Sequence, residues 1–239
     1  MKKQTLAGLA LSTALFSSLN ASSCQINSGA YVGLSLGGAH LGGKNDFQLS
    51  NQNLGAPEPS SSHKLSSNSF NGIVFVGYGL KFGTLWCAAE ILYQFDNLSS
   101  KDRVSADAPN DKGKVVESKT TGAFGGAVHI GALMNPNTVI YAILGVEGRS
   151  FRVKFNDDQQ ATTCTINKRY TSTAFTPGVG FRFSVSKNLA LKTEYKYSLH
   201  QSKKLTSDTK PSAAGGNDIV TLKHAPNIQS FNVGLVYTF

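Results

Sequence analysis

The last nine residues of the chain alternate strictly between two kinds of position. Every second side chain is apolar or aromatic: Phe231, Val233, Leu235, Tyr237 and Phe239. The positions between them are mixed: Asn232, Gly234, Val236 and Thr238. A period of two is that of a β-strand, whose successive side chains point to opposite faces. One face of this strand therefore meets an apolar environment and the other a mixed one.

The same alternation recurs in seven upstream segments. In Leu189–His200, leucine, threonine and tyrosine share one face, and the opposite face carries lysine, glutamate and histidine. The other segments span 29–41, 69–82, 84–98, 120–134, 138–155 and 175–183. Within 138–155 the phase slips between Gly148 and Phe151, which predicts a β-bulge there. The sequence thus predicts eight strands.

The connections between these segments alternate in length. Short turns lie at Lys81–Thr84, Met134–Thr138 and Ser186–Asn188. Long polar connections span 43–68, 99–119, 156–168 and 203–226. No run of about 18 apolar residues is present inside the chain, so no helix is expected to cross a bilayer. The pattern predicts an all-β fold: an eight-stranded antiparallel transmembrane β-barrel with short periplasmic turns and long extracellular loops, in a bacterial outer membrane. Closure is required because unpaired strand edges cannot face lipid.

The N-terminus has the features of an export signal. Two lysines precede the short apolar stretch Leu6–Leu19, and the small residues Ala21–Ser23 follow. We expect a signal peptide at 1–23, cleaved after Ala21 or Ser23, and a barrel domain at 24–239. Small residues before Cys24 leave lipidation of this cysteine as an alternative.

Four motifs carry a resemblance to a known superfamily: Tyr31-Val-Gly-Leu, Pro177-Gly-Val-Gly-Phe, Leu191-Lys-Thr-Glu-Tyr-Lys-Tyr and Val233-Gly-Leu-Val-Tyr-Thr-Phe. The chain resembles the opacity-type and OmpA-type eight-stranded outer-membrane barrels, without a peptidoglycan-binding domain. The resemblance implies that the aromatic end of the last strand, Tyr237 and Phe239, is read by the barrel assembly machinery.

Seven charged residues are expected on inward faces: Glu90, Glu147, Arg149, Arg182, Lys192, Glu194 and Lys196. The interior of an eight-stranded barrel is just wide enough for side chains to fill it. Buried charges must pair or cost several kcal/mol, so we expect an ion-pair network that plugs the lumen. Arg182 and Glu194 should be opposite or diagonal neighbours across a short turn. A narrow gated pore is the alternative, and His129 is expected to fill the interior.

One motif has the spacing of a catalytic pair. In His200-Gln201-Ser202 the first and third side chains would share a strand face and could act as base and nucleophile. Outer-membrane lipid A deacylases resemble this pattern, but Lys203 stands where that family has asparagine. His200 should also face inward. We therefore expect no catalytic residue, and a lipid A-modifying enzyme remains the alternative.

The cysteines show no metal-binding spacing, and neither a metal nor another cofactor is expected. Cys87 and Cys164 belong to opposite ends of the predicted barrel, too far apart for a disulfide. Pairing of Cys24 with Cys87 is geometrically conceivable.

The chain is basic, with a formal net charge of +9, of which the two signal-peptide lysines contribute two, leaving +7. Such a charge favours anionic partners. We expect outer-membrane lipid and lipopolysaccharide as neighbours, no nucleic acid, and a monomer. Opacity-type barrels tend to use surface loops for adhesion. The resemblance therefore implies a non-enzymatic, envelope-structural surface barrel that adheres to host or anionic surface ligands, through the fourth-loop lysines Lys203, Lys204, Lys210 and Lys223.

Overall fold

The computed structural model describes residues 25–51, 61–104, 114–156, 165–206, 210–211 and 217–239. The predicted signal peptide, Cys24 and Cys164 lie outside these residues. The strands are β1 (Gly29–Asn51), β2 (Ser61–Phe82), β3 (Leu85–Asp96), β4 (Leu98–Val104), β5 (Lys114–Asn135), β6 (Thr138–Asn156), β7 (Thr165–Ser184), β8 (Leu189–His200), β9 (Lys203–Thr206), β10 (Lys210–Pro211) and β11 (Asn217–Thr238). Within the described ranges no helix has the length and apolarity to cross a membrane.

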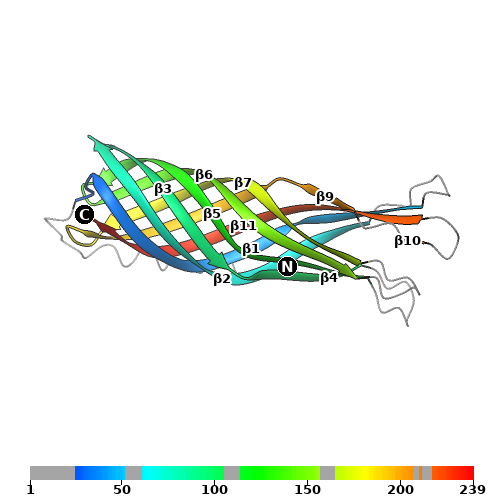
Figure 1. Ribbon diagram of the computed structural model, residues 1–239. Helices are drawn as coiled ribbons and strands as arrows, with labels where there is room; N and C mark the ends of the chain where they lie inside the picture. The colour runs from blue at the N-terminus through cyan, green and yellow to red at the C-terminus, as the bar shows by residue number, and fades with distance from the viewer. Residues whose placement is uncertain (1–24, 52–60, 105–113, 157–164, 207–209, 212–216) are drawn as a thin grey trace, which may run out of the picture.

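Eight long strands form one closed antiparallel ring (Figure 1). The order is β1-β2-β3-β5-β6-β7-β8-β11, and β11 pairs with β1 to close the ring. The short strand β4 continues β3 and pairs with β5, while β9 continues β8 and pairs with β11. The predicted eight-stranded barrel is therefore confirmed, as are the three short turns between the strands.

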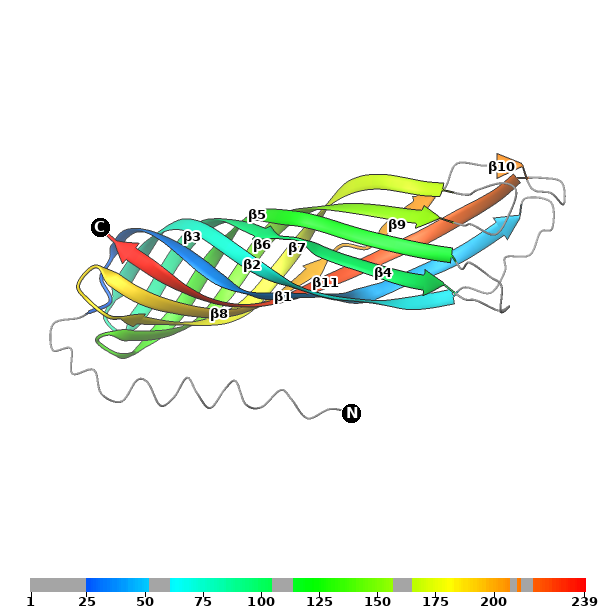
Figure 2. The same ribbon diagram turned by 90° about the horizontal axis from the view of Figure 1, so that it is seen from below.

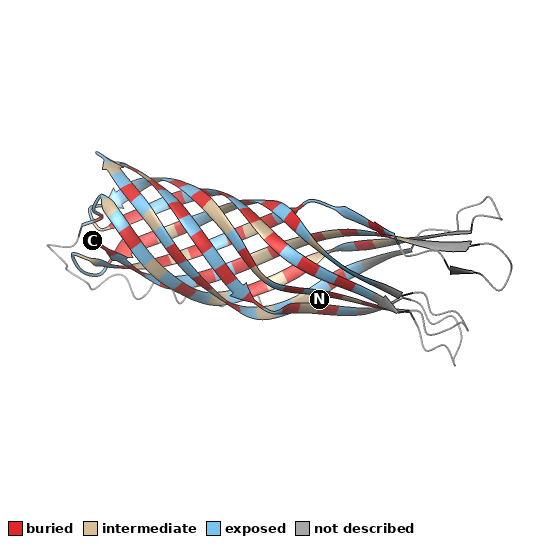
Figure 3. Ribbon diagram, in the orientation of Figure 1, coloured by how far each residue is buried: buried red, intermediate tan, exposed pale blue. Residues whose placement is uncertain are grey.

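Buried and exposed residues alternate along the strands, which gives the barrel wall a chequered appearance (Figure 3). In β3 the alternation is unbroken from Trp86 to Asp96. The exposed positions carry large apolar side chains, such as Ile91 and Phe231, and form the belt that meets lipid. Phe183 has the same strand parity as the outward-facing Phe175 and Val179, although it is only 6% exposed.

Several strands extend far toward one end of the molecule (Figures 1 and 2), past the last exposed apolar residues of the belt. β1 reaches Asn51 and β2 starts at Ser61, so most of the predicted loop at 43–68 is strand. We call this part of the barrel the outer extension; it comprises residues 44–51, 61–67, 98–104, 114–121, 150–156, 165–171, 203–206 and 217–225. Above the membrane the outward face no longer needs apolar side chains, so the alternation that reveals a strand disappears from the sequence.

The predicted bulge in β6 is wrong. β6 pairs with β7 without interruption, and Phe151 is buried on the same face as Arg149. The irregularity lies on β5, because Thr120 pairs with Phe151 and Ala123 with Arg149, leaving two β5 residues opposite one on β6. One of the two is Gly122, whose φ of +144° is rarely adopted by other residues.

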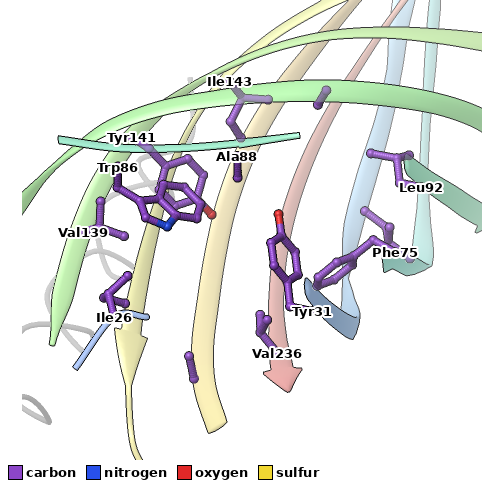
Figure 4. Close-up of a cluster of buried hydrophobic side chains, with 13 residues drawn as sticks. Ile26, Tyr31, Phe75, Trp86, Ala88, Leu92, Val139, Tyr141, Ile143 and Val236 are labelled. Atoms are coloured by element: carbon purple, nitrogen blue, oxygen red, sulfur yellow. The ribbon is translucent and has the colours of Figure 1, made fainter. Parts of the chain in front are cut away.

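Two apolar clusters lie inside the barrel. The periplasmic one gathers Ile26, Tyr31, Ile73, Phe75, Trp86, Ala88, Leu92, Ala127, Val139, Tyr141, Ile143, Ala190 and Val236 (Figure 4). Ile26 precedes β1, is 1% exposed, and donates a backbone hydrogen bond to Pro136 O at 2.9 Å. The outer cluster contains Ala39, Leu41, Leu98, Phe151 and Ile228. Charged and polar side chains contact members of both clusters: Lys192 Nζ lies 3.8 Å from the centre of the Phe75 ring, and the His200 and Phe151 rings lie 5.1 Å apart.

Candidate functional site in the lumen and on the outer extension

A lysine–glutamate network fills the lower part of the polar lumen. Lys192 Nζ lies 2.7 Å from Glu90 Oε2 and 3.0 Å from Glu194 Oε1. Lys196 Nζ lies 3.1 Å from Glu194 Oε2. Tyr141 OH also donates a hydrogen bond to Glu194 at 3.0 Å. All four charged side chains are at most 5% exposed, so each charge is neutralised by direct contact rather than by solvent.

Arg182 borders this network without joining it. Its register partner is Lys192, while Glu194 faces Gly180, so Arg182 and Glu194 are diagonal neighbours as expected. In the described part of the chain, however, no ion pair joins them. Arg182 Nη2 instead donates to Thr238 Oγ1 at 2.7 Å, and the guanidinium lies 4.9 Å from the centre of the Tyr31 ring. Cation–π contact thus takes the place of a carboxylate.

A second charged group lies nearer the outer end. Arg149 donates to Asp96 Oδ2, and its Nε is 3.6 Å from Glu147. His200 Nε2 lies 3.5 Å from the same Glu147 oxygen. Gln94 donates to Asp96 at 2.8 Å. The predicted network did not include Asp96, although its shared strand parity with Glu90 and Gln94 could have revealed it.

The lumen is balanced in charge. Its buried acids in the described chain are Glu90, Asp96, Glu147 and Glu194, and its buried bases are Arg149, Arg182, Lys192 and Lys196. All seven predicted lumen residues are buried, and six of them form ion pairs. The equal numbers of acids and bases account for a stable polar filling inside a narrow barrel.

One cluster has the geometry of a metal site. Ligand atoms of Glu90, His129 and Glu194 all lie within 4.8 Å of one another. The ammonium of Lys192 contacts both carboxylates at 2.7 and 3.0 Å, in the place that a cation would take. Because a bound cation would have to displace this lysine, the cluster is better described as an ion-pair site.

The structure does not bring together His200 and Ser202, the pair on which the enzyme alternative depends. β8 ends at His200, so the rule that alternate residues share a face does not extend to Ser202. His200 is buried beside Glu147 and Phe151, whereas Ser202 is exposed. The geometric premise of the base–nucleophile alternative is therefore wrong.

A second histidine cluster has hydrogen bonds like those of a catalytic triad. Ser118 Oγ lies 3.0 Å from His224 Nε2, and Tyr170 OH lies 3.1 Å from His224 Nδ1. Burial in the outer extension lowers the pKa of His224 to about 4, so the ring is neutral at ordinary pH. Ser118 and His224 are both 0% exposed. Because no substrate can reach the serine, the cluster serves to satisfy buried polar groups.

The predicted ligand-binding lysines lie on the outer extension. Lys203, Lys204 and Lys223 are exposed, and Lys204 stands directly opposite Lys223. The backbone of Lys210 pairs with Asp218, but its side chain lies outside the described part of the structure.

The register also reveals basic rows that the sequence analysis missed. Lys44 faces Lys64 across β1 and β2. Lys119, Arg152 and Arg169 face one another across β5, β6 and β7. All five side chains are exposed. Only the strand register could have revealed them, because the members of each row are distant in the sequence.

The end of the last strand has the predicted orientation. Tyr237 and Phe239 are 47% and 73% exposed, whereas Thr238 is 7% exposed. The two aromatic rings pack edge to face at 5.3 Å, and Phe239 N donates to Ala30 O at 3.0 Å. Recognition by the assembly machinery remains a prediction.

Cys87 is a free thiol that is partly exposed on the wall.

A closed barrel with an apolar belt, a polar lumen and an aromatic final strand defines an integral protein of the bacterial outer membrane. Residues 7–239 match the model of the outer membrane protein beta-barrel domain, and the chain belongs to this family. No curated protein sequence matches the chain.

Solved structures with a similar fold include three outer-membrane proteins. The outer membrane protein OprG of Pseudomonas aeruginosa shares 11% identity at a TM-score of 0.53, over 91% of this chain and 99% of that one. The outer membrane protease OmpT of Escherichia coli shares 11% at 0.52, over 90% and 99%. A major outer membrane protein of Thermus thermophilus shares 12% at 0.52, over 88% and 99%. At these identities the likeness concerns the fold.

Proposed function

We propose that the protein is a non-enzymatic surface barrel that stabilises the envelope and binds anionic ligands, on host cells or other surfaces, through its outer extension. The proposal rests on two pairs of lysines, each facing the other across adjacent strands of the outer extension. Lys204 faces Lys223, and Lys44 faces Lys64, with all four side chains exposed.

Like charges directly opposite each other destabilise a pair of strands. Two such lysine pairs therefore cost stability. Asp46, the register partner of Lys223, is the acid that lies beside them. A polyanionic ligand would relieve the repulsion and gain several contacts at once. A basic surface also raises the rate of encounter with anionic partners.

The lumen favours this proposal over a pore. Its interior is filled by paired charges and by two clusters of buried apolar side chains, rather than lined by charges around an open channel. An enzyme that modifies lipid A through His200 is also disfavoured, since its side chain is buried next to Glu147 and away from lipid.

The test compares cells of a host that otherwise lacks the protein. They express the wild type, a quadruple variant with Lys203, Lys204, Lys210 and Lys223 changed to Gln, or His200→Ala. Heparin binding is measured at two salt concentrations, together with lipid A mass spectra. A control variant replaces Lys81 and Lys187, which lie at the periplasmic end, by Gln.

We expect wild-type binding to fall sharply with salt, because exposed charges are screened over about 8 Å at physiological ionic strength. The quadruple variant should bind weakly, and the periplasmic control should bind like the wild type. Binding that ignores both salt and the four lysines would refute the proposal. A lipid A profile that changes with His200→Ala would favour the enzyme, and steady single-channel conductance in planar bilayers would favour the pore.

A further inference from the structure

The irregularity on β5 opens a recess in the outer wall. Thr121 and Gly122 lack a register partner on both neighbouring strands, since β3–β5 pairing stops at Ala123 and β4–β5 pairing resumes at Thr120. A recess of about 470 Å³ lies at this point. Asn97, between β3 and β4, Thr121 and Ser150 contribute polar groups to its lining. The recess is thus a consequence of the bulge.

The basic row Lys119–Arg152–Arg169 borders the recess. Lys119 pairs in register with Arg152, and Arg152 pairs with Arg169, so three cations stand side by side on adjacent strands. All three are exposed, and none forms an ion pair within the described part of the chain. The row therefore presents several unpaired donors toward one small space.

The surroundings do not neutralise this row. On the next row outward, Glu117 stands between Lys101 and Lys154 and is matched by them. The lumen, in contrast, contains equal numbers of buried acids and bases among the described residues. Because cross-strand repulsion costs stability, the uncompensated row is best explained by an anion that occupies the recess.

The height of the recess above the membrane indicates which anion. Asn97 lies two residues beyond Phe95, and Arg169 lies six residues beyond Phe175, both of which are exposed aromatic residues at the edge of the apolar belt. With a rise of about 3.3 Å per residue and a strand tilt of about 40°, the recess spans roughly 5 to 15 Å above this edge. Polar headgroups fill roughly the first 5 to 8 Å beyond the hydrocarbon core, so the lower end of the recess lies at headgroup level.

We propose that the recess binds a phosphate group of a phosphorylated glycolipid in the outer leaflet. Arg152 and Arg169 donate to the phosphate oxygens in the bidentate manner of guanidinium groups, and Lys119 adds a third charge. Ser150 and Thr121 supply hydroxyl donors below them. The lipid is favoured over a soluble anion because the recess lies just above the apolar belt, where the polar groups of outer-leaflet lipids are concentrated. The site uses β5–β7 and does not depend on the lysine pairs of β9–β11 and β1–β2 that carry the proposed function.

The experiment titrates the protein, purified from outer membranes in mild detergent, with diphosphoryl lipid A and counts bound lipid by native mass spectrometry. The wild type is compared with the triple variant Lys119→Gln, Arg152→Gln and Arg169→Gln. Dephosphorylated lipid A and free inorganic phosphate are titrated in parallel. We expect one lipid bound to the wild type and at least about a tenfold weaker affinity in the triple variant, from loss of charge-assisted hydrogen bonds.

The quadruple variant, with Lys203, Lys204, Lys210 and Lys223 changed to Gln, serves as the matched control. It should keep lipid A binding and lose heparin binding, while the triple variant should do the reverse, so the two proposals can fail separately. Equal lipid A loss in both variants, or none in the triple variant, would overturn the site. Equally tight binding of dephosphorylated lipid would exclude phosphate as the recognised group, and equally tight free phosphate would exclude a lipid source. The single variants Arg152→Gln and Arg169→Gln carry the same test if the triple variant does not fold.

Discussion

Glu194 is the carboxylate on which the lower lumen network depends. It contacts Lys192 at 3.0 Å and Lys196 at 3.1 Å, and it accepts a hydrogen bond from Tyr141. Lys192 has a second partner in Glu90, whereas Lys196 forms no other ion pair in the described chain. The change Glu194→Gln keeps the volume and leaves the ammonium of Lys196 buried without a counter-charge.

The expected loss of stability follows from leaving the one buried charge of Lys196 without a partner. Breaking a buried pair by removal of one partner costs about 3–5 kcal/mol, whereas replacing both charges by apolar or neutral groups is often close to neutral. Adding Lys196→Met to Glu194→Gln should therefore recover about 2 kcal/mol or more of the loss. Adding Arg182→Met should recover little, because Arg182 bonds Thr238 and forms no ion pair with Glu194. The two double variants thus differ only in which base is removed, Lys196 or Arg182.

Urea unfolding of the refolded barrel in detergent, followed by tryptophan fluorescence, measures these differences. The single, double and control variants form a double-mutant cycle, whose coupling energy isolates the Glu194–Lys196 interaction. Strictly additive losses in both doubles would refute the network, and equal recovery by Arg182→Met would show that total lumen charge matters rather than the pairing seen in the structure.

Three further predictions follow from the wall of the barrel. The folded protein should migrate faster than the heated protein on a denaturing gel, because a closed hydrogen-bonded ring resists detergent; a helical circular-dichroism spectrum would contradict this. Phe239→Ala should lower outer-membrane yield more than Thr238→Ser, and equal yields on immunoblots would argue against an assembly role for the terminal aromatic. Gly122→Ala should cost about 1–3 kcal/mol by urea titration, since its φ is positive and a Cβ would come 2.7 Å from Gln94 O. Gly148→Ala, whose Cβ would meet nothing closer than 3.9 Å, is the control, and an equal loss there would remove the bulge as the cause.

The period of two predicted most of the fold. It placed Glu90, Lys192 and Glu194 on inward faces, because a membrane belt forces apolar residues outward and leaves polar ones for the lumen. The same rule fails in the outer extension, where both faces of β1 and β2 beyond the belt meet water or polar neighbours and residues such as Lys44 and Lys64 look like loop.

Pairing between strands could not be predicted from one sequence. The phase slip near Gly148 was attributed to its own strand, but the extra residue lies on β5, and only hydrogen-bond register distinguishes the two. For the same reason the row formed by Lys119, Arg152 and Arg169 was missed: each looks like an isolated solvated charge until the register sets them side by side. Spacing across the turn likewise predicted that Arg182 and Glu194 are neighbours, but not that Glu194 pairs with Lys192 and Lys196 instead.

The seam between β1 and β11 has a consequence for biogenesis. It joins Tyr31 to Thr238, residues about two hundred positions apart, and loop-closure entropy must be overcome before such a contact forms. Until β11 has been synthesised, the edge of β1 that does not pair with β2 has no partner, and the apolar belt is not closed. We therefore expect the barrel to become stable late in its folding, when its first and last strands meet.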